Sequence, residues 1–222
     1  MATALKKADE RQRRPQKRSE ANRERIVAAA EHLFAERGYS DTSIDAVAAK
    51  VGMHQPGIYY YFPSKQALYE EVIRAAISPL DERIKELLTS SDSPEERLLK
   101  SITAWVDLLA ERPPLAQLIL HEAAKPDSKA IARILPEMGT RVQEMIEDAF
   151  KELGLEATPD DVFHYASATT GAAVFYVAAM QPLMSGRKKP DVKRSMERHK
   201  QLLLISTRDL IRTLCEEPAR TK

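Results

Sequence analysis

Residues 42–68 read TSIDAVAAKVGMHQPGIYYYFPSKQAL, and this stretch decides the fold. Its apolar residues recur at helical spacing on both sides of Gly52, which predicts two short helices joined by a glycine turn. Ala48, four positions before that glycine, is a small residue at the point where the two helices would cross. This spacing suits a helix-turn-helix over residues 43–62, although an ordinary helical hairpin with a glycine in its turn has the same pattern.

Start and stop signals bound the helices of this region. Thr42 precedes the first short helix as its expected N-cap, and Asp45 at the third position would complete a capping box. Upstream, a longer helix is expected from about Ser19 to Arg37, and Gly38 tolerates positive φ just past its end. The rest of the chain also has helical period and no alternating strand pattern, so the sequence predicts an all-α protein.

The outer face of the second short helix has the composition of a surface that reads base edges. It carries hydrogen-bonding and aromatic side chains where a core helix would carry leucine and valine. Glutamine pairs bidentately with adenine, and a glycine lets the backbone approach the bases closely. Three consecutive tyrosines cannot all face one core, so part of this helix must meet solvent or a partner. The residues concerned are His54, Gln55, Gly57, Tyr59, Tyr60 and Tyr61.

At these residues the sequence resembles the TetR family, named for the tetracycline repressor. The resemblance runs from Ile26 to Leu68, and the remaining residues resemble the family only in length and helix layout. It implies an N-terminal three-helix DNA-binding head that contains the helix-turn-helix, followed by a larger helical body for ligand binding and dimerisation. We expect the head at residues 19–66 and the body at residues 67–222.

The resemblance also implies roles for single residues. Phosphate contacts are implied for Thr42, Ser43 and Lys65. Base-facing positions are matched by His54, Gln55 and Gly57. Contacts to phosphate or to thymine methyl groups are matched by Tyr60 and Tyr61. For Tyr59 the resemblance leaves two roles open, packing within the head or contact with DNA. Pro56 departs from the pattern of many members, so the family's base preference at that position cannot be transferred to this chain.

The first 18 residues form a basic, flexible arm on an otherwise balanced protein of net charge +1. They hold seven Lys or Arg residues against two acidic residues. Counterion release favours Lys and Arg placed along DNA phosphates, so the arm, with Lys17 and Arg18 next to the head, is a candidate DNA contact in the adjacent minor groove. A disordered tail with no binding role is the alternative.

Two helical stripes near the C-terminus suit a homodimer interface, because the small residues of the first stripe allow close helix approach. A homodimer would place two reading helices on a palindromic operator of double-stranded DNA. The alternative is that both stripes face the core of their own domain. The residues concerned are Ala166, Thr170, Ala173, Val177, Leu203 and Leu210.

Aromatic, histidine and methionine residues of the body are candidates to line a pocket for a hydrophobic or amphipathic effector. Residues of these types at helical spacing are more often plain core, and that alternative stays open. The candidates are Trp105, His121, Phe163, His164, Tyr176 and Met180. An effector that binds one state more tightly would release the DNA, which predicts a ligand-responsive repressor. Activation instead of repression, and a regulator without an effector, are the alternatives.

Other classes of protein lack support in the sequence. It has no glycine-rich phosphate loop, no HExxH and no nucleophile elbow, and its five histidines lack metal-ligand spacing. We therefore expect no enzyme, no metal and no other cofactor. Cys215 is the only cysteine, which excludes an internal disulfide and fits a reducing cytoplasm. Residues 162–186 carry no Asp, Glu, Lys or Arg, but the unbroken apolar part is about half of the roughly 20 residues that a membrane span needs.

Overall fold

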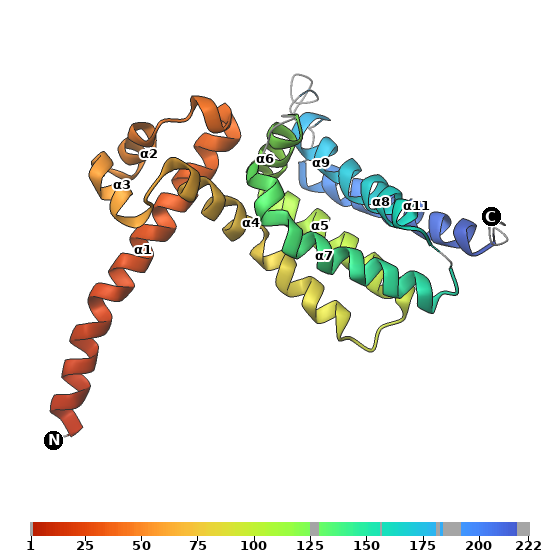
Figure 1. Ribbon diagram of the computed structural model, residues 1–222, viewed down its shortest axis with the longest axis horizontal. Helices are drawn as coiled ribbons and strands as arrows, with labels where there is room; N and C mark the ends of the chain where they lie inside the picture. Colours follow the sequence, from red (N-terminus) through yellow and green to blue (C-terminus); the bar gives the residue numbers. More distant parts are fainter. Residues whose placement is uncertain (1, 125–128, 156, 181–182, 184–191, 217–222) are drawn as a thin grey trace. The chain divides into compact units, whose positions relative to one another are not determined.

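The chain folds into two compact units, which we call the N-terminal unit (Met1–Ala75) and the C-terminal unit (Ala76–Lys222). The structure is a computed structural model that describes residues 2–124, 129–155, 157–180, 183 and 192–216 (Figure 1). These residues form helices and connecting turns and contain no β-strand, so the predicted all-α fold is confirmed.

Three helices and the start of a fourth build the N-terminal unit. They are α1 (Ala2–Asp41), α2 (Ile44–Val51), α3 (Gln55–Tyr61) and α4 (Lys65–Leu88). Helix α4 crosses the division between the units, because its residues up to Ala75 belong to the first unit and those from Ala76 to the second.

Helix α1 is longer than the sequence predicts, because it begins at Ala2 and not at Ser19. Residues 2–18 are mostly of types with high helix propensity, and Pro15 is the one proline among them. Figure 1 shows these first turns, in red, extending past α2 and α3. At the other end Gly38 has φ 76° and ψ 174°, so the positive φ predicted there is confirmed.

The core of the N-terminal unit lies where α1 meets the shorter helices. The edge of the Tyr69 ring lies against Phe34, with 4.9 Å between ring centroids, and Tyr39 lies 5.0 Å from Tyr69. Burial of each large apolar side chain stabilises the unit by roughly 1.5–3 kcal/mol. The fully buried aliphatic residues include Ile26, Ala30, Val47, Ile58, Leu68 and Val72.

The C-terminal unit continues α4 with further helices, as the helical period of this part of the sequence predicts. They are α5 (Pro94–Glu111), α6 (Pro113–Ala123), α7 (Lys129–Glu152), α8 (Pro159–Ala166), η1 (Ser167–Gly171), α9 (Ala172–Phe175), η2 (Tyr176–Met180) and α11 (Val192–Glu216). Helix α7 runs through Pro136 without a break, and the segment from Pro159 to Met180 contains two π-helical stretches, η1 and η2.

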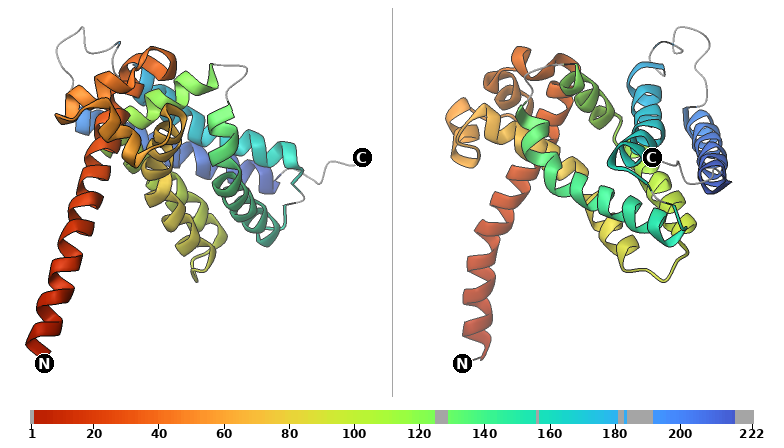
Figure 2. Two further views of the ribbon diagram at one scale, coloured as in Figure 1. Left: turned by 60° about the vertical axis from the view of Figure 1, so that its left-hand side comes forward. Right: turned by 45° about the vertical axis from the view of Figure 1, so that its right-hand side comes forward.

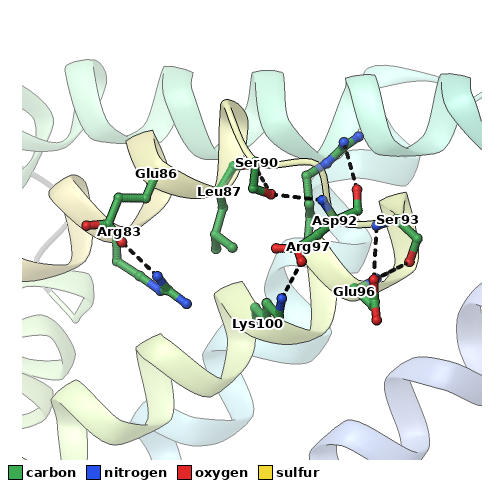
Figure 3. Close-up of polar contacts among 9 residues, drawn as sticks. All are labelled: Arg83, Glu86, Leu87, Ser90, Asp92, Ser93, Glu96, Arg97 and Lys100. Carbon is green, nitrogen blue, oxygen red and sulfur yellow. Dashed lines mark hydrogen bonds and ion pairs between the residues drawn. The ribbon is translucent and has the colours of Figure 1, made fainter.

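Helix α5 is anchored at its start by a capping box (Figure 3). The Ser93 hydroxyl oxygen accepts a hydrogen bond from the Glu96 backbone N–H at 3.3 Å, and the Glu96 carboxylate accepts from the Ser93 backbone N–H at 3.0 Å. These bonds favour the charged carboxylate and hold the pKa of Glu96 below its ordinary value. Lys100, one turn further on, pairs with Asp92 at 2.5 Å.

Helix α5 is also the element against which the rest of the C-terminal unit packs. The Trp105 indole N–H donates to the Thr170 carbonyl at 3.1 Å, which joins α5 to η1. The Lys200 ammonium pairs with Asp107 at 2.9 Å, which joins α5 to α11. Figure 2 shows α11, in dark blue, beside the α8–α9 segment.

Replacing Gly52, in the turn between α2 and α3, with alanine is expected to lower the free energy of unfolding of the N-terminal unit by about 1 kcal/mol. The cost is backbone strain, because φ is +69° while nothing lies within 4 Å of an added Cβ. Urea unfolding followed by circular dichroism measures it.

Gly139→Ala in α7 is the matched control. This site also has open space, but its backbone is not in the left-handed region, so alanine is expected to leave stability unchanged or raise it slightly. Equal losses for the two substitutions would contradict the assignment of strain to the turn.

Candidate nucleic-acid interface

The start of α2 is capped by Ser43 and not by Thr42, so the predicted cap is wrong by one residue. The Ser43 side chain is exposed, and its oxygen accepts a hydrogen bond from the Ala46 backbone N–H at 3.1 Å. Thr42 is instead 1% exposed, with its hydroxyl 3.0 Å from the Leu33 carbonyl and 2.8 Å from the Gly38 carbonyl.

This geometry separates two residues, Thr42 and Ser43, for which the resemblance implies the same phosphate contact. The Thr42 hydroxyl donates to main-chain carbonyls inside the unit, so the side chain cannot reach a phosphate. Its function is to close the end of α1 onto the start of α2. Ser43 stays at the surface, where the first turn of α2 also presents backbone N–H groups that suit an anion.

The turn between α2 and α3 has the geometry that the sequence predicts. Gly52 lies in the left-handed region, with φ 69° and ψ 35°. The Met53 N–H donates to the Ala48 carbonyl at 2.9 Å, and the Gly52 N–H donates to the Ala49 carbonyl at 3.2 Å. These two bonds satisfy carbonyls at the end of α2 and direct the chain into α3.

Helix α3 has one buried face and one exposed face. Ile58 and the following Phe62 are 0% and 2% exposed, so they hold the helix on the core. Tyr60 is 81% exposed and Tyr59 43% exposed, which places both rings on the outer surface. Tyr61 is half-buried, and its ring lies edge-on to Tyr60 with 5.1 Å between centroids.

The remaining α3 positions differ in their surroundings. His54 is exposed at the N-cap of the helix. The Gln55 amide nitrogen is 3.5 Å from the Asp45 carboxylate, so this side chain leans toward α2. Gly57 is close to Met53, whose methyl carbon would lie 3.0 Å from an added Cβ. Glycine at position 57 therefore leaves room for the side chain of Met53.

Lys65 is held at the start of α4 by contacts within the N-terminal unit. Its ammonium donates to the Ser40 carbonyl at 3.1 Å and lies 4.5 Å from the centre of the Tyr39 ring. The positive charge is thus fixed beside the last turn of α1. Of the two arm residues expected at the interface, Arg18 is exposed on α1, whereas the Lys17 side chain lies outside the part that the structure describes.

Two residues of α1 support this surface and were missed from the sequence. The Asn22 amide donates to the Tyr61 hydroxyl at 3.3 Å, and the Arg25 guanidinium donates to the Val51 carbonyl at 3.1 Å. Both contacts join residues 26 or more positions apart. The available signal was that Asn22 and Arg25 are polar residues three positions apart, on one face of the helix just before its apolar run.

A carboxylate between two arginines ties α1 to α4. Glu71 lies 2.7 Å from Arg23 and 2.7 Å from Arg74, and the Arg23 guanidinium also lies 5.0 Å from the centre of the Phe62 ring. Burial alone would favour the neutral carboxyl, but the hydrogen bonds and charges of the two arginines outweigh it. They hold the pKa of Glu71 below its ordinary value of 4.5.

The predicted effector residues do not form one cluster in the C-terminal unit. Trp105 is 8% exposed, and Tyr176 stacks on His199 with 4.0 Å between ring centroids. Phe163, at 68% exposed, and the exposed His164 lie on the surface, so neither lines an interior space. The helical wheel did not separate the two faces of α8. His121 and Met180 are half-buried.

The predicted dimer stripe is also partly wrong. Ala173 and Val177 are 0% and 3% exposed and face the core of their own unit, so they cannot contact a partner. The half-buried members are Ala166, Thr170, Leu203 and Leu210. Large apolar side chains that do reach the surface of these helices are Phe163, Phe175, Leu202 and Ile205.

Two other features, a metal-binding cluster and a membrane-spanning helix, are not found among the described residues. Within the described ranges, no cluster of three or more His, Cys, Asp or Glu side chains is arranged to hold a metal ion. None of the helices that the structure describes is both long enough and apolar enough to cross a membrane.

The geometry defines a class of fold, in which a unit with two short helices and a glycine turn is joined to a second all-helical unit. The family of bacterial regulatory proteins, tetR family, matches residues 26–72, which span the buried part of α1 through the start of α4. The N-terminal unit of this chain belongs to that TetR family, as its sequence motif indicates.

Known relatives match mainly over part of the chain. The uncharacterized HTH-type transcriptional regulators YuxN and YdgC of Bacillus subtilis (strain 168) are 28% and 29% identical over 106 and 122 residues. These matches cover 48% and 52% of this chain but 36% and 63% of the relatives, so less than two thirds of their length is spanned. The solved structure of the fatty acid degradation regulator FadR from Bacillus halodurans shares the fold, with TM-score 0.62 and 21% identity over 82% of this chain and 97% of that one.

The pair of arginines around Glu71 predicts a pH dependence of stability. Because the folded pKa is lower than the unfolded one, the stabilisation is present above about pH 4.5 and is lost as pH falls through the folded pKa. Glu71→Gln is expected to lower the free energy of unfolding at pH 7 by about 0.5–1 kcal/mol, since Arg23 and Arg74 are largely solvated.

The loss caused by Glu71→Gln should shrink as the pH is lowered from 6 to 3, because the wild-type carboxyl then becomes neutral too. Urea unfolding followed by circular dichroism at several pH values measures this. Glu24→Gln, at an exposed position of α1, is the control and should show no such convergence. A Glu71→Gln loss that is constant with pH would contradict the ionic origin.

Proposed function

We propose that this protein is a DNA-binding transcription regulator, a repressor that a small-molecule effector releases from a palindromic operator. One observation carries the DNA-binding part: α3 is fixed on the core by Ile58 and Phe62 while Tyr59 and Tyr60 project outward. The outer rings of Tyr59 and Tyr60 are not part of the buried core that holds α3 in place. They do suit contact with base edges and phosphates in a major groove.

The dimensions of α3 fit this proposal. An α-helix with its side chains is about 10–12 Å across, and a major groove is about 12 Å wide. His54 and Ser43 lie exposed at the starts of α3 and α2, so a duplex that meets Tyr60 would also meet two helix N-termini. We propose His54, Gln55, Tyr59 and Tyr60 as the side chains that face the groove, with Ser43, Tyr61 and Lys65 toward the phosphates.

A palindromic operator requires two copies of α3, and the surface of the C-terminal unit suggests how they pair. Phe163 and Phe175 are 68% and 54% exposed, with the small residues Ser167, Ala168 and Gly171 exposed between them. Leu202 and Ile205 are 46% and 51% exposed on α11. We propose that these two apolar surfaces form the homodimer interface.

For the effector part of the proposal, the relatives suggest where to look. The HTH-type repressor KstR2 and the HTH-type activator FasR, both of Mycolicibacterium smegmatis, show that either polarity occurs among relatives. A FadR of Bacillus subtilis with this fold is known in complex with stearoyl-CoA. We therefore propose an amphipathic acyl compound as the first effector class to test, acting through α4, which belongs to both units.

Genomic operator selection with the purified protein tests DNA recognition. A palindromic site should be recovered, and fluorescence anisotropy should show that Tyr60→Ala weakens binding to it by roughly 10- to 100-fold, as expected for lost base contacts. Tyr60→Phe is the matched variant, because it keeps the ring and removes the hydroxyl. Recovery of sequence-independent binding alone would overturn the proposal.

Analytical ultracentrifugation at micromolar concentration tests the dimer. Ile205→Glu puts a charge into the proposed apolar interface and is expected to shift the protein to monomers, because an unpaired buried charge costs several kcal/mol. Ala110→Glu adds the same charge at an exposed position of α5 and should leave the dimer intact. A wild-type protein that sediments only as a monomer would rule the interface out.

Thermal denaturation in the presence of stearoyl-CoA and of other metabolites tests the effector. A ligand at about 100 times its dissociation constant adds roughly 2.7 kcal/mol to the free energy of unfolding. Trp105, the only tryptophan, lies in the C-terminal unit and gives a second, fluorescent readout. No shift with any compound would favour a regulator without a small-molecule effector.

A further inference from the structure

The helical form of the N-terminal residues places their positive charges in a definite order. Helix α1 begins at Ala2, so residues 2–37 share one helical register. Lys7, Arg11, Arg14 and Arg18 are spaced by four, three and four positions. At 3.6 residues per turn these four positions fall within about 60° of one another around the helix axis. We call them, together with Arg25, the basic stripe.

The basic stripe leads to the proposed DNA-reading surface. Arg25 is seven positions after Arg18 and lies on the same line, and its guanidinium donates to the Val51 carbonyl at the end of α2. From Lys7 to Arg25 the stripe is about 27 Å long, at 1.5 Å per residue. It therefore runs along α1 as far as the end of α2, where the turn to α3 begins, within the same unit.

The other basic residues of the segment lie on a different face, where acidic residues offset them. Lys6, Arg13 and Lys17 share a face about 100° from the stripe, by the same helical geometry. Glu10 and Glu24 fall on that face too, whereas no acidic residue falls among the positions of the stripe. The seven charges of the segment thus divide into one unopposed row of positive charge and one mixed face.

The face opposite the stripe indicates what kind of partner the helix suits. It holds the positions of Leu5, Asp9, Gln12 and Gln16. A helix that lies in a membrane surface needs several large apolar residues on that face, and Leu5 is the one large apolar residue among these four. A row of positive charge without an apolar face suits a polyanion that is contacted from one side, such as the phosphate backbone of duplex DNA.

We propose that the basic stripe binds backbone phosphates of the DNA that flanks the operator half-site, as a helical extension of the reading head. This deepens the proposed function and rests on it. The helix fixes which charges take part: Lys7, Arg11 and Arg14 bind phosphates, while Lys6, Arg13 and Lys17 do not. A flexible arm would use both sets alike.

Two triple variants of the full-length protein separate these cases. The stripe variant carries Lys7→Gln, Arg11→Gln and Arg14→Gln. The control variant carries Lys6→Gln, Arg13→Gln and Lys17→Gln. Each removes three positive charges from the same segment, and glutamine keeps the helix propensity of lysine and arginine. Circular dichroism confirms that both retain the wild-type helix content.

Fluorescence anisotropy between 50 and 200 mM salt gives the readout, on the selected operator with its flanks and on a random duplex. Each lost phosphate contact lowers the slope of log K against log salt by about 0.9, so the stripe variant should lose about 2.7 and the control variant less than about 1. Over this salt range the wild-type protein should lose about 40-fold more affinity than the stripe variant does.

The outcomes are distinct. Equal slope changes for the two variants, or no change for either, would overturn the stripe. If the operator and the random duplex bind equally, the proposed function fails, but the comparison of the two variants on the random duplex still decides the stripe. Trimming the flanks of the operator should lower the wild-type slope to that of the stripe variant, and an unchanged slope would again overturn the inference.

Discussion

The interface depends on one left-handed residue between two short helices. A helix of seven residues such as α3 is not stable by itself in water, so its form comes from the packing of Ile58 and Phe62 on the core. That packing requires α3 to leave α2 at the angle that Gly52 allows, with the Met53 N–H bonded back to the Ala48 carbonyl. The same angle turns Tyr59 and Tyr60 outward. Backbone strain avoided at one glycine therefore determines which side chains are offered to a partner.

Helix α1 stabilises the arrangement of α2 and α3 from the side opposite the exposed tyrosines. Its buried face forms the core, and its polar positions reach three different segments: Asn22 contacts Tyr61, Arg25 contacts the end of α2, and Arg23 contacts Glu71 of α4. Each of these contacts is individually weak, because most of the groups remain partly solvated. Together they restrict the orientation of α3 without placing any further group on its outer face.

The sequence was sufficient for the helical class and for the turn between α2 and α3, because these depend on local signals: apolar spacing and Gly52. It was insufficient where two neighbours could play one role. Thr42 and Ser43 both can cap a helix, and the choice follows from the Leu33 carbonyl, which is distant in sequence. For Ala173 and Val177, apolar spacing identified a buried face but not whether the neighbour is the same chain or another copy.

The two π-helical stretches have a consequence for the relation between sequence and surface. A π-helical turn closes over i to i+5, so it holds about one residue more than an α-helical turn, and that extra residue corresponds to roughly 100° of rotation. A single helical wheel at 100° per residue therefore cannot be drawn through η1, because residues before and after it are out of phase on such a wheel. Deleting one residue between Ser167 and Gly171 would convert the stretch to a regular helix and keep Phe175 in the same angular relation to Phe163, because the shorter turn completes the same rotation. A chain that is one residue shorter here and regularly helical would therefore present the same faces, so alignments across this helix should be read by phase as well as by identity.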